Sequence, residues 1–168
     1  MNIREYRESD RQEIAEIYVG NWQKTYRGLL PDAFLDRMNP EDAAEKWSGY
    51  VRTPEQGILV AEESGIVAGF AAYRPDDSDE HALYLDSLHV AQNMRGQGIG
   101  TALIRAVGRH AANSGCARMT IRIVRGNDTA GALYRKLGAV HVRYFTDWFG
   151  DTPSNSEELI WEDLSVFL

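Results

Sequence analysis

The chain has a single cysteine, Cys116, among its 168 residues, so it has no internal disulfide. A lone cysteine suits a reducing compartment. The first residues, Met1–Glu5, lack the apolar segment of a secretory signal. Apolar runs such as Ile58–Ala61 are far too short to cross a bilayer. These shortages predict a cytoplasmic protein that does not enter a membrane.

Basic residues are also in short supply, because 18 lysines and arginines stand against 25 aspartates and glutamates, for a net charge of −7. Nucleic-acid-binding proteins rely on a basic face, so this balance argues against nucleic acid as a partner. An acidic protein can still have a local basic cradle, which Arg95, Arg105 and Arg109 could form. The four histidines show no ligand spacing with one another, and no metal site is predicted.

Strand and helix patterns alternate along the chain, without an internal repeat or a linker. We therefore expect one mixed α/β domain that spans residues 1–168. The expected strands are Ile3–Tyr6, Ile58–Glu62, Ile66–Tyr73, Leu83–Val90, Met119–Val124, Val140–Thr146 and Leu159–Leu164. The expected helices start after Ser9 or Asp10 and after Asp128, with further helical stretches at Phe34–Met38, from Pro40 to Trp47 and from Thr101 to Ser114.

The most informative motif is the run Arg95–Gly100, which lies between the strand ending at Val90 and a helical stretch from Thr101. Its glycines let several N–H groups point outward at a helix start, where the helix dipole favours phosphates. The third glycine comes one position too early for a dinucleotide-binding loop, and no Gly-Lys-Ser/Thr follows as in NTPases. The alternative is a plain turn from strand to helix.

The segment Leu85–Ile104 resembles the signature of the GNAT superfamily of N-acetyltransferases. That signature is a strand ending in valine, then Arg/Gln-x-x-Gly-x-Gly/Ala, then a helix with small and apolar residues. Arg95, Gly98 and Gly100 occupy its three defining positions. A second segment, Asn127–Ala139, is similar to the family's Asn-x-x-Ala-x-x-x-Tyr-x-x-x-Gly-Phe element, with alanine in place of the final aromatic residue.

The resemblance covers nearly the whole chain and implies a fold and a co-substrate. The fold is a mixed, twisted α/β sheet of about seven strands flanked by about four helices, which is the GNAT acyltransferase fold. The co-substrate is acetyl-CoA, and the acceptor is an amine. The fold is compatible with a homodimer, although no residue of the chain requires one.

In the family, the pantetheine arm of coenzyme A pairs with the strand before the loop, here at Leu88 and Val90, and the pyrophosphate meets the loop N–H groups. Arg95 either contacts a phosphate or is a surface arginine. Asn127 bonds the cofactor arm, caps the following helix, or both. For His89 the alternative is a packed histidine. The predicted cofactor-binding residues are Leu88, His89, Val90, Arg95, Gly96, Gln97, Gly98, Ile99, Gly100, Thr101, Asn127 and Tyr134.

Two catalytic residues are predicted. Tyr134 matches the family position whose hydroxyl protonates the leaving thiolate, and its alternative is a packed aromatic residue. Asp86 is the best ionisable substitute for the base, because Tyr84 fills the position where many relatives have glutamate. The alternative for Asp86 is a half-buried carboxylate bonded to the backbone. Tyr84 and Asp86 share a strand face unless a bulge intervenes.

The acceptor site is predicted at Trp22, Tyr26, Tyr84 and Asp86. The segment Trp22–Pro31 resembles one found in a bacterial branch of these enzymes, and its aromatic residues suit cation–π contacts or plain core packing. A connecting loop, Tyr144–Ser156, is expected to form the opposite wall with Trp148 and Phe149. The acidic stretch Asp76–Glu80 suits either a cationic acceptor or a solvated surface.

Two functional interpretations remain open at this point. The first is an N-acetyltransferase that acts on a primary amine of a small molecule, with a protein or peptide amino group as the alternative acceptor. The second is a non-catalytic acyl-CoA-binding or regulatory module. The presence of both Tyr134 and a nearby carboxylate favours the enzyme.

Overall fold

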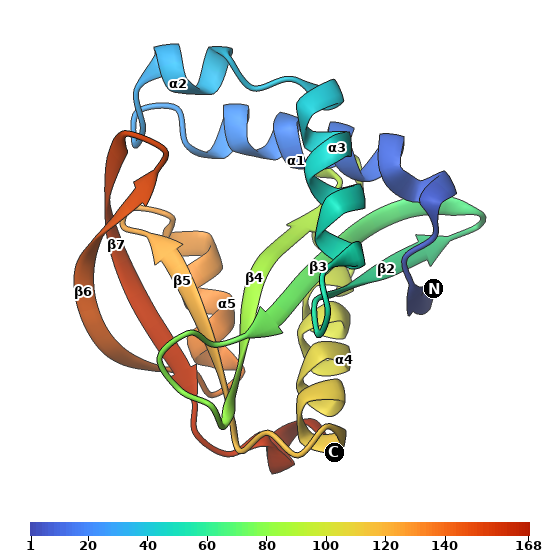
Figure 1. Cartoon of the computed structure of the whole chain (residues 1–168), viewed down its shortest axis with the longest axis vertical. Helices are drawn as coiled ribbons and strands as arrows, with labels where there is room; N and C mark the ends of the chain where they lie inside the picture. Colours follow the sequence, from blue (N-terminus) through green and yellow to red (C-terminus); the bar gives the residue numbers. More distant parts are fainter.

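The frame of the protein is a seven-stranded sheet in the order β1-β2-β3-β4-β5-β7-β6 (Figure 1). The computed structural model describes all residues from 1 to 168. Neighbouring strands run antiparallel except β4 and β5, which are parallel. The strands are β1 (Asn2–Glu5), β2 (Gly57–Glu63), β3 (Ile66–Pro75), β4 (Ala82–Val90), β5 (Arg118–Val124), β6 (Val140–Phe149) and β7 (Thr152–Trp161).

Five α-helices accompany the sheet: four substantial ones, as predicted, and the short α2 of five residues, which overlaps the helical piece expected at Phe34–Met38. Three short 3-10 turns complete the fold. The helices are α1 (Arg11–Thr25), α2 (Asp32–Asp36), α3 (Pro40–Arg52), α4 (Ile99–Asn113) and α5 (Asp128–Lys136). The 3-10 turns are η1 (Glu8–Asp10), η2 (Gln92–Met94) and η3 (Leu164–Phe167).

The predicted loop Tyr144–Ser156 is wrong, because β6 and β7 pair over most of this range and turn at Gly150. Strand β7 begins with Thr152, Ser154 and Ser156 turned inward and buried. These inward positions are small and polar, so the segment lacks the apolar alternation by which a strand is predicted.

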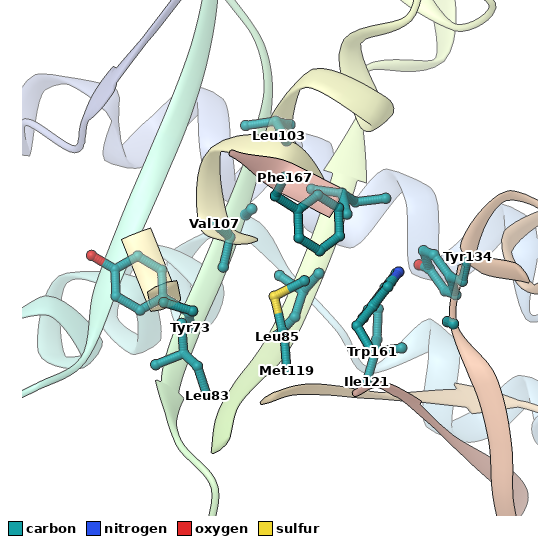
Figure 2. Packing of buried hydrophobic residues seen from close by; sticks show 14 of the residues in the cluster. Tyr73, Leu83, Leu85, Leu103, Val107, Met119, Ile121, Tyr134, Trp161 and Phe167 are labelled. Carbon is teal, nitrogen blue, oxygen red and sulfur yellow. The ribbon is translucent and has the colours of Figure 1, made fainter. Parts of the chain in front are cut away.

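Both faces of the sheet are covered. On β3, Phe70 and Ala72 pack toward α1 and α3, around the fully buried Trp47, whereas Ala71 and Tyr73 pack toward α4. This alternation is the period of two that a strand imposes. Figure 2 shows the α4 side of the core, with Tyr73, Leu83, Leu85, Leu103, Val107, Met119, Ile121, Tyr134, Trp161 and Phe167.

The parallel strands β4 and β5 separate along their length (Figure 1). They pair only from Ala82 with Arg118 to Leu85 with Ile121, while β4 continues to Val90 and β5 to Val124. The far half of β4 therefore has a neighbour on one side only.

A bulge lies on β4 where the separation begins. Leu85 pairs with Tyr73 and Ser87 pairs with Ala72, so Asp86 is an extra residue without a partner on β3. The shared face predicted for Tyr84 and Asp86 required a regular strand, and Asp86 is itself the bulged residue, so simple alternation along β4 does not apply to this pair.

Candidate active site

A cavity of about 730 Å³ lies between the separated strands β4 and β5. It brings together every predicted site residue except Gln97, whose side chain lies outside it. The predicted residues that line it are Trp22, Tyr26, Tyr84, Asp86, Leu88, His89, Val90, Arg95, Gly96, Gly98, Ile99, Gly100, Thr101, Asn127 and Tyr134. A second cavity of about 830 Å³ along β5, α5 and β7 contains none of them except Asn127.

The glycine loop forms one end of this cavity. Gly96 (φ +77°) and Gly98 (φ +80°) have left-handed backbones, and a Cβ on either would meet no protein atom within 4 Å. The first helical bond of α4 runs from the Ala102 N–H to the Gly98 carbonyl, and no N–H from Gly96 to Thr101 donates to a backbone carbonyl. This cluster of free donors at the start of a 15-residue helix suits an anion.

Of the three arginines considered for a basic cradle, only Arg95 lines the cavity. Arg105 and Arg109 lie on the exposed face of α4. The positive potential at this end therefore comes from the free N–H groups, the α4 dipole and Arg95.

The free edge of β4 offers backbone groups to the cavity. The Ala91 N–H donates to the Ala68 carbonyl over 2.8 Å, which fixes the alternation of bonds between β3 and β4. By that alternation, Leu88 and Val90 direct their N–H and carbonyl groups away from β3. The Asn21 side-chain amide donates to the Val90 carbonyl (3.0 Å), and the backbone groups of Leu88 face the cavity.

The His89 side chain lies on the face of β4 opposite to the side chains of Leu88 and Val90, where it is packed among aromatic rings. It stacks on Phe70 with ring centres 5.5 Å apart and meets the edge of Tyr18 at 5.3 Å. Burial, with smaller contributions from the positive charges of Lys46 and Arg95, lowers the pKa of His89 to about 3. The ring is therefore neutral at physiological pH, as in the packed-histidine alternative.

Tyr134 lies on α5 with its ring against Trp161 (6.1 Å between ring centres), at the edge of the core (Figure 2). The residue is 6% exposed and lines the cavity. Burial, reinforced by Tyr26 and Tyr84 nearby, raises the pKa of the Tyr134 hydroxyl above its ordinary value. The hydroxyl therefore carries its proton at neutral pH and can donate it.

Asn127 precedes α5, but its side chain makes no capping hydrogen bond with the helix. It lies beside Tyr26, where it partly offsets the burial that raises the pKa of the Tyr26 hydroxyl. Of the two interpretations from the sequence, capping by the side chain is therefore absent, and Asn127 lines the cavity.

Charged residues gather at the end of the cavity beyond β4. Asp86 forms an ion pair with Arg74 (Arg74 Nε to Asp86 Oδ2, 3.5 Å). Arg74 also pairs with Asp77 (3.1 Å). The Tyr84 ring lies between the guanidinium groups of Arg74 (4.8 Å) and Arg122 (4.9 Å). Burial, followed by the charge of Asp86, raises the pKa of Tyr84, so this hydroxyl is also protonated.

Sequence reasoning missed Arg74, Arg122 and Lys46, which all line the cavity. Arg122 carried a signal, because it is a charged residue inside an otherwise apolar strand. Lys46 carried none, since it enters the site only through the packing of α3 on the sheet.

An aromatic wall closes the cavity on the α1 side. Trp22 contacts Tyr26 at 4.6 Å and Phe149 at 5.0 Å between ring centres, and Phe34 lies behind them. Trp22 and Tyr26 are thus packed together and line the cavity at the same time. Phe149 from β6 lines the cavity but packs on Trp22, so it extends the same aromatic wall rather than forming the expected opposite one, and Trp148 is exposed.

The acidic stretch Asp76–Glu80 lies outside the cavity. Asp76 is buried and accepts hydrogen bonds from Thr120 and Ser78, and Asp79 forms a two-point bond with Arg118 (2.7 and 3.0 Å). Because the stretch lines no part of the cavity, and Asp76 and Asp79 bind groups of the same chain, it does not face the acceptor end as one of the two interpretations expected.

No three His, Cys, Asp or Glu side chains are grouped so that they could hold a metal ion. None of the helices has the length and apolar character needed to cross a membrane.

The model of the Acetyltransferase (GNAT) family matches residues 11–139, which is most of the chain. The chain belongs to this family. Its mixed sheet of seven strands is the GNAT fold, as the sequence predicted, and the membership makes it an acetyltransferase. The narrower bacterial branch suggested by Trp22–Pro31 stays a prediction.

Known proteins align with this GNAT chain over nearly its full length. The thialysine N-epsilon-acetyltransferase of Mus musculus is 29% identical over 157 residues, covering 87% of this chain and 88% of the relative. The crystal structure of ribosomal-protein-alanine N-acetyltransferase from Brucella melitensis has a TM-score of 0.76 at 25% identity, covering 96% and 99% of the two chains. YncA from Salmonella typhimurium, solved with its cofactor acetyl-CoA, shares the fold (TM-score 0.74, 22% identity, 96% and 92% covered).

Proposed function

We propose that this GNAT enzyme transfers the acetyl group of acetyl-CoA to a primary amine of a small molecule, in the cytoplasm. The observation that carries the proposal is the convergence of three features in one cavity. These are the free N–H groups before α4, the free edge of β4 and the protonated hydroxyl of Tyr134. They match the pyrophosphate, the amide-containing pantetheine arm and the thioester sulfur of acetyl-CoA.

The chain's own residues have distinct roles in holding this co-substrate. The N–H groups from Gly96 to Thr101, with Arg95, bind the pyrophosphate. Leu88 and Val90 pair with the pantetheine amides as a neighbouring strand would. Asn127 bonds the arm near Tyr26. The acetyl-CoA bound to YncA from Salmonella typhimurium supports this assignment by analogy of fold.

The acceptor must lose a proton to attack. An alkylamine with a pKa near 10.4 is mostly protonated at pH 7, and its deprotonation costs roughly 4–5 kcal/mol. Asp86 takes this proton directly or through water. The amine nitrogen then bonds to the thioester carbonyl carbon, the carbon–sulfur bond breaks, and Tyr134 donates its proton to the departing sulfur. Tyr84 and the aromatic residues Trp22 and Tyr26 position the acceptor.

Replacing Asp86 with asparagine is expected to lower kcat about tenfold, since a base contributes less where water can also accept the proton. The Kd of acetyl-CoA, measured by calorimetry, should stay within about twofold because Asp86 lies at the other end of the cavity. Asp77→Asn is the matched control, because Asp77 binds the same arginine but lies outside the cavity. Equal losses in the two variants would assign Asp86 to the positioning of Arg74 rather than to proton transfer.

The alternatives are an acceptor that is a protein amino group and a module without turnover. One relative is named for thialysine and another for ribosomal-protein alanine. These names therefore do not distinguish a small-molecule acceptor from a protein acceptor. Thiol release from acetyl-CoA, across amino acids, polyamines, aminoglycosides and peptides with free amino termini, separates them. We expect small amines to outpace peptides, and a preference for peptides would contradict the small-molecule acceptor.

A further inference from the structure

We propose that Arg122 binds a carboxylate of the acceptor, so that the substrate is an amine that also carries a carboxylate, as in an amino acid. This inference rests on the proposed function and names its substrate class. The relevant observation is an arginine in the cavity wall that stacks on aromatic rings and forms no ion pair with any residue of the chain.

Arg122 lies on β5 directly after Ile121, the last residue that pairs with β4. Its guanidinium forms cation–π contacts with the rings of Tyr84 (4.9 Å) and Phe145 (5.5 Å). It forms no ion pair and no hydrogen bond with any other residue. Stacking between rings holds a guanidinium in place while its N–H edge stays free. That edge is a planar fork of donors that matches a carboxylate in two-point geometry.

The carboxylates near Arg122 have other partners. Asp86 is paired with Arg74. Asp76, whose pKa the charge of Arg122 helps to lower, uses its oxygens on Thr120 and Ser78. Asp147 accepts a hydrogen bond from the Trp148 N–H (2.9 Å). Glu158, which lies opposite Arg122 on β7, is paired with Arg143 (3.0 Å). None of these carboxylates forms an ion pair with Arg122, so its N–H edge is free for a carboxylate from outside the chain.

A second cation increases the demand for an anion. Lys46 from α3 lines the same cavity, donates to the Tyr18 hydroxyl (3.1 Å) and lies over the rings of Tyr18 and Trp47, without an ion pair. Besides Arg95 at the glycine loop, the cavity lining thus has three cations, Lys46, Arg74 and Arg122, and two carboxylates, Asp86 and Asp147. A polyamine would add positive charge to this excess, whereas the carboxylate of an amino acid balances it.

The test uses pairs of acceptors that differ only in the charge of the distal group. The probes are ω-amino acids of three to six carbons, such as 5-aminopentanoate, each compared with its amide, so that the amine and its pKa stay nearly matched. Thiol release from acetyl-CoA gives kcat/KM for each member. For the wild-type enzyme we expect the acid to exceed the amide by about 10- to 100-fold in at least one pair.

In Arg122→Gln this acid-to-amide ratio is expected to fall at least about tenfold, mostly through the KM of the acid. Arg122→Lys should retain an intermediate ratio, because a point charge replaces the fork. Arg105→Gln, on the exposed face of α4, is the control and should keep the wild-type ratio. The KM of acetyl-CoA reports whether each variant is folded.

The outcomes separate the two proposals. Turnover in which every amide equals or exceeds its acid, or in which Arg122→Gln keeps the wild-type ratio, overturns the carboxylate assignment and leaves the acetyltransferase proposal standing. Absence of thiol release with every acid, amide, polyamine and peptide overturns the proposed function, and with it this inference.

Discussion

Replacing Tyr134 with phenylalanine is expected to lower kcat about 100-fold, at the low end of what a positioned proton donor contributes. The loss stays moderate because a thiolate with a pKa near 8.5 leaves fairly well without help. Phenylalanine keeps the ring against Trp161, so the core and the Kd of acetyl-CoA should be nearly unchanged. Stopped-flow or steady-state thiol release measures the first quantity and calorimetry the second.

The matched control is Tyr144→Phe, which removes a hydroxyl from an exposed tyrosine that lines no part of the site cavity. It should retain wild-type kcat. Wild-type turnover in Tyr134→Phe would contradict the assignment of Tyr134 as the acid and favour the packed-aromatic alternative.

The pH dependence follows from the direction of the Tyr134 shift. Burial raises its pKa above the ordinary value near 10, so the proton is present at every pH below that value. The rate should therefore rise with pH as the acceptor amine loses its proton, without a fall before about pH 10. A fall between pH 7 and 9 that is absent from Tyr134→Phe would mean that the hydroxyl titrates lower than its burial implies.

Gly98→Val is expected to weaken acetyl-CoA binding at least about 100-fold, or about 2.7 kcal/mol. Gly98 has φ +80°, and its missing Cβ would point into the open space that the phosphates must enter. A branched side chain there both strains the left-handed backbone and displaces the ligand from the N–H groups. Calorimetric titration with acetyl-CoA gives the change directly.

Gly115→Val separates these two effects. Gly115 has a similar φ (+87°) and equally open surroundings, but it follows the other end of α4. This variant should be destabilised to a similar degree in thermal unfolding while its affinity for acetyl-CoA is kept. Wild-type affinity in Gly98→Val would show that the loop does not hold the phosphates.

The sequence predicted the parts of the site that local chain chemistry determines. The glycine-rich run between an apolar strand and an amphipathic helix identified the loop, and β4 and α5 were recognised from their apolar patterns and motifs. The end of β4, the glycine loop and the start of α4 line one cavity because they are consecutive in the sequence, and α5 reaches it through the pairing of β5 with β4.

The sequence did not predict features that arise between distant segments. The bulge at Asp86 depends on the register against β3, and no residue type marks it. Lys46 reaches the cavity because α3 packs on α1, and Arg74 because β3 pairs with β4. The sequence offered an acidic loop for a cationic acceptor. The structure instead lines the cavity with Lys46, Arg74 and Arg122, which suit a carboxylate.

The most direct test of the account is amine-dependent thiol release by the wild-type enzyme at saturating acetyl-CoA, with the acetylated product quantified by mass spectrometry. The account predicts one N-acetylated amine for each thiol released, at a rate that depends on the acceptor. Tight binding of acetyl-CoA with no amine-dependent release, for small amines and peptides alike, would contradict it and favour a regulatory acyl-CoA-binding module.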